Sequence, residues 1–295
     1  MGDLLGAAGA PRARLRELLA GPAPLLAPGA YDALTARLVE EAGFDAVYMT
    51  GFGTTASLIG RPDVGLLSGT EMVDNARRIA AAVDLPVIAD ADTGYGNALN
   101  VVRTVQLYEQ AGVAGIQLED QVMPKKCGHM NGKALVATDE MTGKVRAAVA
   151  ARRDPDLVVI ARTDAVAVTG VDDALERARA YADAGADLLF VEAPTSEADV
   201  EKVATALDGV APLVFNWAEG GRTPPLSLER VRELGFALVI YPIGTLLAAT
   251  AGVRSLLAAL REKGVPPLDG LPTFDEFTDL VGLPEVQELE QRFAR

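Results

Sequence analysis

The sequence predicts a (β/α)8 barrel of the TIM type, because short apolar segments alternate with amphipathic helical segments from about residue 25 to 263. Most of the apolar segments are continuous, as in parallel strands that are buried on both faces. The dipeptide Ala-Gly closes three predicted helices, at Ala42-Gly43, Ala111-Gly112 and Ala184-Gly185, and a strand follows each of them. An open doubly wound sheet is the alternative, but no Gly-x-Gly-x-x-Gly motif follows the first strand.

Each element has its own signal along the chain. The predicted strands are residues 25–27, 46–50, 86–92, 115–120, 157–164, 188–193, 213–216 and 238–242. Predicted helices, with apolar residues three and four apart, cover residues 30–42, 72–82, 100–111, 139–151, 172–184 and 198–207. Thr138 and Ser227 are expected to cap the helices that follow them.

The end of the chain lies outside the repeat. Pro266-Pro267 interrupts it, and an amphipathic helix is expected at residues 285–293. We therefore predict one domain over residues 1–295, with the barrel at about 25–263 and a helical extension at about 270–295. The extension is expected to pack on a neighbouring element or on another subunit.

Composition limits the possible functions. Of the 295 residues, 49% are hydrophobic and 23% are charged, as in a globular protein with a sizeable core. The net charge of -14 argues against binding to nucleic acid or to an anionic membrane. A single cysteine and a single histidine cannot build an intrachain disulfide or a zinc site of the usual Cys/His kind. No signal peptide or membrane span is recognised, so we expect a cytoplasmic enzyme.

Acidic residues stand at the ends of five successive predicted strands. In chain order they are Asp90 and Asp92, Glu119 and Asp120, Asp164, Glu192, and Glu219. One such acid often caps the next helix, but the strand ends of a barrel meet at one mouth, where active sites lie. Asp90 and Asp92 are two residues apart on a predicted strand and are expected to share one face. With Glu119 they predict an oxygen-ligated Mg²⁺ site; a structural calcium site is the weaker alternative.

Two loops add further candidates. Residues 50–55, Thr-Gly-Phe-Gly-Thr-Thr, are expected to form a Gly-rich loop whose free backbone N–H groups hold a carboxylate or phosphonate. Residues 121–133 form a long basic loop that contains Lys125, Lys126, Cys127 and His129. These cationic neighbours predict a lowered pKa for the Cys127 thiol and a role in proton transfer. Arg162 is expected either to bind a second anionic group or to form a structural ion pair.

Several motifs together resemble the isocitrate lyase/phosphoenolpyruvate mutase superfamily. They are Lys125-Lys126-Cys127-Gly128-His129, Asp90-Ala91-Asp92, Glu119-Asp120-Gln121, Ala161-Arg162-Thr163-Asp164 and Tyr241-Pro242. They cover nearly the whole chain and are similar to the 2-methylisocitrate lyase branch and to the carboxyvinyl-carboxyphosphonate phosphonomutase branch. The resemblance implies a homotetramer, a barrel whose last helix is exchanged with a partner, and a gating loop that carries residues 125–129.

The same resemblance implies roles for individual residues. Asp90 would ligate Mg²⁺ (or Mn²⁺) directly, and Asp63, Asp92 and Glu119 would reach it through water. Substrate contacts would come from Thr50, Gly51, Phe52, Gly128, Arg162 and Asn216. Cys127 would be the acid/base residue, and the other catalytic residues would be Tyr48, Lys125, His129 and Glu192.

The predicted reaction is cleavage of a C–C bond in a small 2-hydroxy dicarboxylate, 2-alkylmalate-like or methylisocitrate-like, to an oxoacid and a carboxylate. Phe52 and Leu247 depart from the 2-methylisocitrate lyase pattern, in which Leu247 is an arginine that pairs with an additional carboxylate. A smaller dicarboxylate such as a 2-alkylmalate or oxaloacetate is therefore favoured. The alternatives are a phosphonomutase, an oxaloacetate decarboxylase and a catalytically silent barrel that only binds a partner or ligand.

Overall fold

The computed structural model describes residues 10–267 and 269–294 of the chain. Its strands are β1 (Leu25–Ala30), β2 (Val47–Met49), β3 (Val87–Asp90), β4 (Gly115–Glu119), β5 (Val158–Thr163), β6 (Leu188–Val191), β7 (Val214–Asn216) and β8 (Leu238–Tyr241). They form one parallel sheet in the order β6-β5-β4-β3-β2-β1-β8-β7. A further parallel bridge between Leu189 and Leu213 joins β6 to the segment entering β7, so the sheet closes. The predicted barrel is confirmed.

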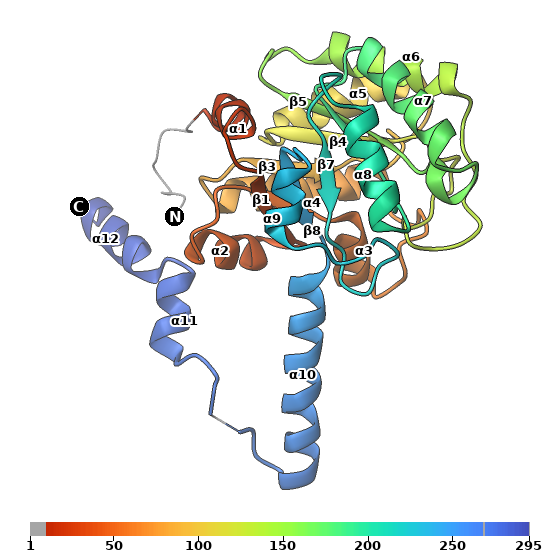
Figure 1. Ribbon diagram of the computed structural model, residues 1–295. Coiled ribbons are helices and arrows are strands. Elements are labelled where there is room, and N and C mark those ends of the chain that lie inside the picture. Colours follow the sequence, from red (N-terminus) through yellow and green to blue (C-terminus); the bar gives the residue numbers. More distant parts are fainter. Residues whose placement is uncertain (1–9, 268, 295) are drawn as a thin grey trace.

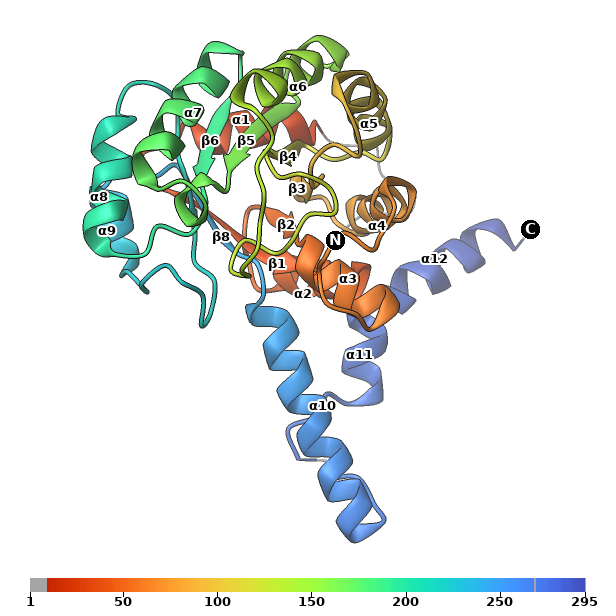
Figure 2. The ribbon, with the colours of Figure 1, turned by 90° about the vertical axis from the view of Figure 1, so that its right-hand side faces the viewer.

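Helices surround the closed sheet (Figures 1 and 2). Those between the strands are α2 (Ala33–Glu41), α3 (Gly51–Ile59), α4 (Gly69–Ala82), α5 (Ala98–Gln110), α6 (Thr138–Ala151), α7 (Val171–Asp183), α8 (Glu197–Ala206) and α9 (Leu228–Glu233). Ser227 caps α9 as predicted, because its side chain accepts from the N–H of Arg230. The predicted cap at Thr138 is wrong, since Thr138 is the first residue of α6 and the N-cap position is Ala137.

The apolar core has two layers. Inside the barrel, the buried side chains include Tyr48, Ile88, Ile160 and Phe190, which alternate along the strands with residues that face the helices. The larger outer layer lies between the sheet and the surrounding helices. A packed barrel interior leaves ligands only the two ends of the barrel.

The helix α1 (Pro11–Leu19) was not predicted. Its Leu15 is fully buried in the cluster that fills the barrel interior. Arg12 donates to the carbonyl oxygens of Glu109 and Val113, and Arg16 donates to the backbone around Leu157. The helix therefore closes the amino-terminal end of the barrel, and these arginines have a structural role.

The carboxyl-terminal helices are α10 (Gly244–Lys263), α11 (Phe274–Leu280) and α12 (Leu283–Phe293). Figures 1 and 2 both show α10 leaving the barrel and projecting away from it. None of its 20 residues is buried. Only its start contacts the sheet, where Thr245 Oγ1 donates to the carbonyl of Gly29, so the helix does not pack along the sheet as the helix after an eighth strand ordinarily does. Among the described residues, no helix is long and apolar enough to cross a membrane.

Candidate active site

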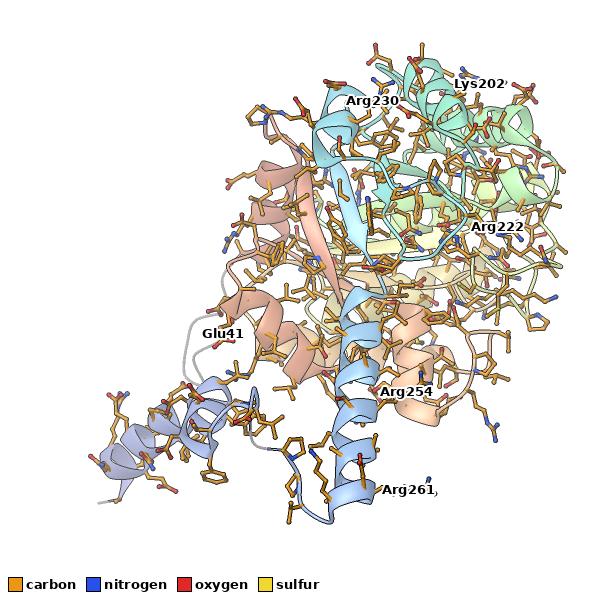
Figure 3. All side chains as sticks on the ribbon, turned by 60° about the horizontal axis from the view of Figure 1, so that its bottom comes forward. Glu41, Lys202, Arg222, Arg230, Arg254 and Arg261 are labelled. Carbon is orange, nitrogen blue, oxygen red and sulfur yellow. The ribbon has the colours of Figure 1, made fainter. Side chains whose placement is uncertain are left out.

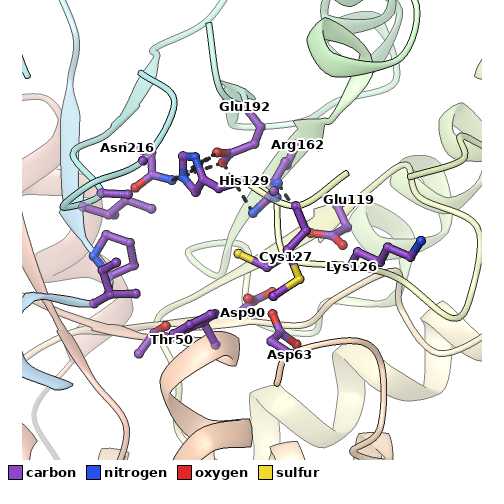
Figure 4. A pocket seen from close by; sticks show the side chains of 18 of the residues that line it. Thr50, Asp63, Asp90, Glu119, Lys126, Cys127, His129, Arg162, Glu192 and Asn216 are labelled. Atoms are coloured by element: carbon purple, nitrogen blue, oxygen red, sulfur yellow. Dashed lines mark hydrogen bonds and ion pairs between the residues drawn. The ribbon is translucent and has the colours of Figure 1, made fainter. Parts of the chain in front are cut away.

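A pocket opens at the carboxyl ends of the strands, where the sequence places its acids (Figure 4). The predicted site residues that line it are Tyr48, Thr50, Phe52, Asp63, Asp90, Glu119, Lys125, Cys127, Gly128, His129, Arg162, Glu192 and Asn216. Gly51 and Asp92 are not in the lining but contact it: Gly51 donates its N–H to Asp90 Oδ2, and Asp92 pairs with Lys125. The fold thus brings the predicted set together.

The acidic side of the pocket holds Asp63, Asp90, Asp92 and Glu119, all of which are buried. The strand β3 ends at Asp90, and Asp92 lies beyond it with a φ of 47°. The expectation that the two residues share a strand face is therefore wrong. A turn, not the two-residue period of a strand, brings Asp92 beside Asp90, whose Oδ1 accepts from the N–H of Asp92.

The ammonium group of Lys125 lies within this acidic cluster. Its Nζ is 2.7 Å from Asp63 Oδ2 and 2.6 Å from Asp92 Oδ1. Burial alone would lower the pKa of Lys125, but the surrounding carboxylates, led by Asp92 and Asp90, raise it well above its usual value. Lys125 therefore keeps its charge and partly compensates the acids.

Nearby cations do not fully balance the negative charge of these four acids. Burial, and then the charge of Asp92, raise the pKa of Asp90 to about 6. Burial also raises the pKa of Glu119 well above its usual range, although Arg162 opposes it, and Glu119 Oε1 is buried without a hydrogen-bond partner. These carboxylates fit a divalent cation, whose charge would offset their repulsion.

The acids do not form a closed cage. Within the described ranges, no three carboxylate, thiol or imidazole side chains are gathered closely enough to ligate one ion. Mg²⁺ commonly keeps several waters and takes only one or two direct carboxylates. The spacing is therefore compatible with Asp90 as a direct ligand and with water between the ion and the other acids.

Residues 51–55 are helical, so the expected Gly-rich loop at residues 50–55 is wrong. Thr50 is the N-cap of α3, and its Oγ1 accepts from the N–H of Gly53 at 3.2 Å. The N–H of Gly51 points to Asp90 Oδ2 at 3.3 Å, and a Cβ at this glycine would lie only 2.5 Å from the same oxygen. The first turn of α3 thus holds Asp90 in place.

Arg162 lies across the pocket floor, over the ring of Phe190. Its Nε and Nη2 each donate to Asp164 at 3.0 Å, and Nη1 lies 3.5 Å from Glu192 Oε2. Asn216 donates to both oxygens of Glu192, while its own buried Oδ1 has no partner. The predicted structural ion pair of Arg162 is confirmed, and its position in the pocket lining leaves the binding of a second anionic group as a prediction.

Cys127 faces the middle of the pocket (Figure 4). The predicted lowering of its pKa is wrong, because burial raises the pKa of the thiol to about 11. The two lysines do not act on the sulfur: Lys125 pairs with the acids, and Lys126 Nζ donates to the carbonyl of Gly132. The thiol is thus neutral at physiological pH, which suits a proton donor better than a nucleophile.

His129 is held from both sides. The N–H of Arg222 donates to Nδ1 at 3.1 Å, so the proton of a neutral ring is on Nε2, which is 3.2 Å from Glu192 Oε1. Burial lowers the pKa of His129, although Glu192 opposes the shift. The arrangement places a neutral imidazole beside Glu192 and Asn216 at the edge of the pocket.

Two further groups support the site: Gln117, which the sequence did not single out, and Glu219, which it gave only as an acid at the end of a strand. Gln117 accepts from the hydroxyl of Tyr48 at 2.9 Å, and burial followed by the charge of Asp90 raises the pKa of Tyr48 well above its usual value. A glutamine inside an apolar strand was the available signal. Glu219, at the edge of the pocket, has a buried oxygen without a partner. Its position next to Gly244 follows from the loops after β7 and β8, which no local pattern predicts.

Comparison with known proteins agrees with this geometry. The family model described as Phosphoenolpyruvate phosphomutase matches residues 15–261. The chain is also 50% identical to 2,3-dimethylmalate lyase of Eubacterium barkeri over 284 residues, which covers 96% of this chain and 98% of that protein. The chain belongs to the isocitrate lyase/phosphoenolpyruvate mutase superfamily. Its predicted identification as an enzyme of this superfamily is confirmed.

Other relatives represent both branches of the superfamily. A 2-methylisocitrate lyase of Aeropyrum pernix is 44% identical, with 95% of this chain and 90% of that protein covered. The chloroplastic carboxyvinyl-carboxyphosphonate phosphorylmutase of Arabidopsis thaliana is 42% identical, with 95% and 84% covered.

Solved structures of the superfamily share the fold. A crystal structure of 2,3-dimethylmalate lyase matches with a TM-score of 0.91 and 42% identity, covering 96% of this chain and 95% of that one. A structure of oxaloacetate acetylhydrolase with the inhibitor 3,3-difluorooxalacetate also has a TM-score of 0.91, with 40% identity and 96% of each chain covered.

Proposed function

We propose that this chain is a divalent-metal-dependent lyase, using Mg²⁺ or Mn²⁺, that cleaves the C–C bond of a small 2-hydroxy dicarboxylate to an oxoacid and a carboxylate. One observation carries the proposal. A neutral thiol faces the same pocket as a cluster of carboxylates whose negative charge nearby cations do not fully balance. The similarity to 2,3-dimethylmalate lyase supports a 2-alkylmalate as the substrate class.

The residues divide into three roles. Asp90 would hold the metal ion directly, while Asp63, Asp92 and Glu119 would hold its waters. The bound ion would stabilise negative charge that develops on the substrate oxygens. Arg162, Asn216 and the first turn of α3 would position the carboxylates of the substrate.

The reaction needs two proton transfers. A base in the pocket takes the proton of the 2-hydroxyl group, the carbonyl of the oxoacid forms, and the C2–C3 bond breaks. The electron pair of that bond passes to C3, where the neighbouring carboxylate delocalises it as an aci-carboxylate. The neutral thiol of Cys127 then donates its proton to C3, assisted by Tyr48 and Glu192.

The pocket favours a small substrate. Phe52, Ile240 and Ile243 give it apolar walls, and Glu219 adds a carboxylate with an unpartnered oxygen. Leu247 is 46% exposed on α10 and is not in the lining, and Arg222 is occupied by His129 and Asn131. Among the described residues that line the pocket around Phe52, Ile240 and Glu219, none is a cation that would pair with a third carboxylate of the substrate.

We expect 2,3-dimethylmalate or another 2-alkylmalate to be cleaved with a kcat/KM higher by orders of magnitude than that for 2-methylisocitrate or isocitrate, because an unpaired buried carboxylate costs several kcal/mol. Steady-state kinetics with lactate dehydrogenase-coupled detection of the oxoacid measures this. Efficient cleavage of 2-methylisocitrate would contradict the size argument.

The same assay separates the other candidates. The substrate panel therefore includes oxaloacetate and phosphonopyruvate. Oxaloacetate acetylhydrolase has the same fold as this chain, and the Arabidopsis phosphorylmutase is similar to it in sequence. Activity with oxaloacetate alone would favour a decarboxylase or hydrolase, and activity with phosphonopyruvate alone would favour P–C chemistry. A barrel that binds these compounds without converting any of them would be catalytically silent.

We also propose that the chain forms a homotetramer in which α10 packs on a neighbouring copy. The projecting helix exposes Val253 (54%) and Leu257 (56%), and Figure 3 shows Arg254 and Arg261 along the same helix, away from the barrel. An isolated 20-residue helix without a packed apolar face is poorly stabilised. Light scattering of the full chain is expected to give the mass of four copies; a stable monomer at micromolar concentration would contradict this.

A further inference from the structure

The loop after β4 has a fixed base and a long excursion over the pocket. Gln121 and Leu135 form an antiparallel bridge, and the N–H of Val122 donates to the carbonyl of Ala134 at 2.8 Å. The chain between these two points includes Cys127 and His129. The base fixes where the loop starts and ends, but other contacts must hold its middle over the pocket.

Lys133 makes such a contact. Its side chain is 1% exposed, and its Nζ donates to Asp164 Oδ1 at 3.0 Å and to the carbonyl of Gly128. Gly128 directly follows Cys127. One ammonium group thus joins the backbone beside the proposed proton donor to a fully buried carboxylate of the barrel.

That carboxylate also orients Arg162. Asp164 Oδ1 accepts from Arg162 Nη2 and Oδ2 accepts from Arg162 Nε, each at 3.0 Å. Burial opposes ionisation of Asp164, but Arg162 and Lys133 lower its pKa to about 2, so the carboxylate is ionised. Lys133, Asp164 and Arg162 form a continuous chain from the loop to the pocket floor.

Close packing at Gly128 completes the connection. A Cβ at this position would meet Arg162 Nη2 and would lie 2.7 Å from Glu192 Cγ. The loop therefore rests directly on the two side chains that face the pocket from β5 and from the end of β6. A small displacement of Gly128 would change the position of Cys127 and the space above Arg162 together.

We propose that Lys133 is a positioning residue that holds the loop closed over bound substrate and aligns Cys127 with Arg162 through Asp164. Without its ammonium group, Asp164 keeps the two bonds from Arg162, whereas the carbonyl of Gly128 loses its hydrogen-bonded connection to Asp164. The contacts of Lys125 and of the Cys127 N–H with Asp63 remain, so the loop loosens at Gly128 and does not unfold. The substrate's identity rests on the proposed function, but the closure of the loop does not.

The test is limited trypsin digestion of the full chain with and without MgCl2 and oxalate, followed by mass spectrometry of cleavage after Lys125 and Lys126. The variants are Lys133→Met, Lys133→Gln, which keeps a neutral NH2 donor group without the charge, and Lys202→Met as a matched control. Lys202 pairs with Asp172 on the outer surface, and its side chain is 44% exposed (Figure 3).

We expect MgCl2 with oxalate to protect the loop in the wild type and in Lys202→Met. Loop cleavage in Lys133→Met should be faster by about tenfold or more, with Lys133→Gln between them, because a buried charged hydrogen bond is lost. kcat/KM on the substrate found by the panel should fall by about 10- to 100-fold, as for a misplaced catalytic group. Selective cleavage in the loop distinguishes this role from a purely structural one, which would speed cleavage along the whole chain.

Loop cleavage equal to the wild type in both Lys133 variants would overturn the proposal, and so would a loop that MgCl2 and oxalate leave unprotected in the wild type. General cleavage along the chain in both variants would overturn it as well. Protection that depends on Lys133, in a chain that turns over none of the panel, would keep the positioning role and reject the proposed reaction.

Discussion

Cys127→Ser is expected to lower kcat by about 10²- to 10⁴-fold, the range of a lost general acid or base. A serine hydroxyl is a far weaker acid than the thiol, whose pKa burial raises to about 11. The loop should remain in place, because its contacts at this position come from the backbone: the N–H of Cys127 donates to the carbonyl of Asp63.

Two measurements separate proton donation from a general defect. Thermal unfolding and the affinity for oxalate with Mg²⁺ should be unchanged in Cys127→Ser. In the wild type, ionisation of the thiol should reduce activity only as the pH approaches about 11, since a raised pKa keeps the proton in place below that value. Near-normal turnover of Cys127→Ser would favour a reaction in which this position only completes the closed loop.

Asp90→Asn is expected to lower kcat/KM by about 10³-fold or more, because losing a direct metal ligand removes several kcal/mol of charge stabilisation. The substitution keeps the shape of the side chain, but its NH2 group replaces one of the two oxygens that accept from the N–H groups of Gly51 and Asp92. It also removes one charge from a crowded acidic cluster, so the folded state should not be destabilised. Isothermal titration with Mg²⁺ and Mn²⁺ measures the loss of binding directly.

The matched control is Asp74→Asn, which changes a carboxylate that is 47% exposed and pairs with Arg77 on the outside of α4. This variant should retain wild-type metal affinity and activity. EDTA should abolish activity in the wild type, and added Mg²⁺ or Mn²⁺ should restore it. Full activity of the wild type and of Asp74→Asn after exhaustive chelation would reject the metal-dependent mechanism.

Several parts of the site follow from local patterns, and others do not. The acids at Asp90, Glu119 and Glu192 could be predicted because the fold fixes where strand ends point. The charge state of Cys127 could not, because it depends on the burial of the thiol and on where the ammonium groups of Lys125 and Lys126 lie in space. Neighbours in the sequence were therefore a poor guide to the pKa.

The sequence by itself determined the barrel, most of its strands, the superfamily and many of the residues that line the pocket, since buried strands, helix ends and motifs are written in consecutive residues. Only the tertiary structure decided what those residues do to one another. It joined the start of α3 at Gly51 to Asp90, turned Asp92 toward Lys125, and connected Lys133 to Arg162 through Asp164. Such contacts join segments far apart in the chain, and their energies depend on burial and distance, which no local pattern contains.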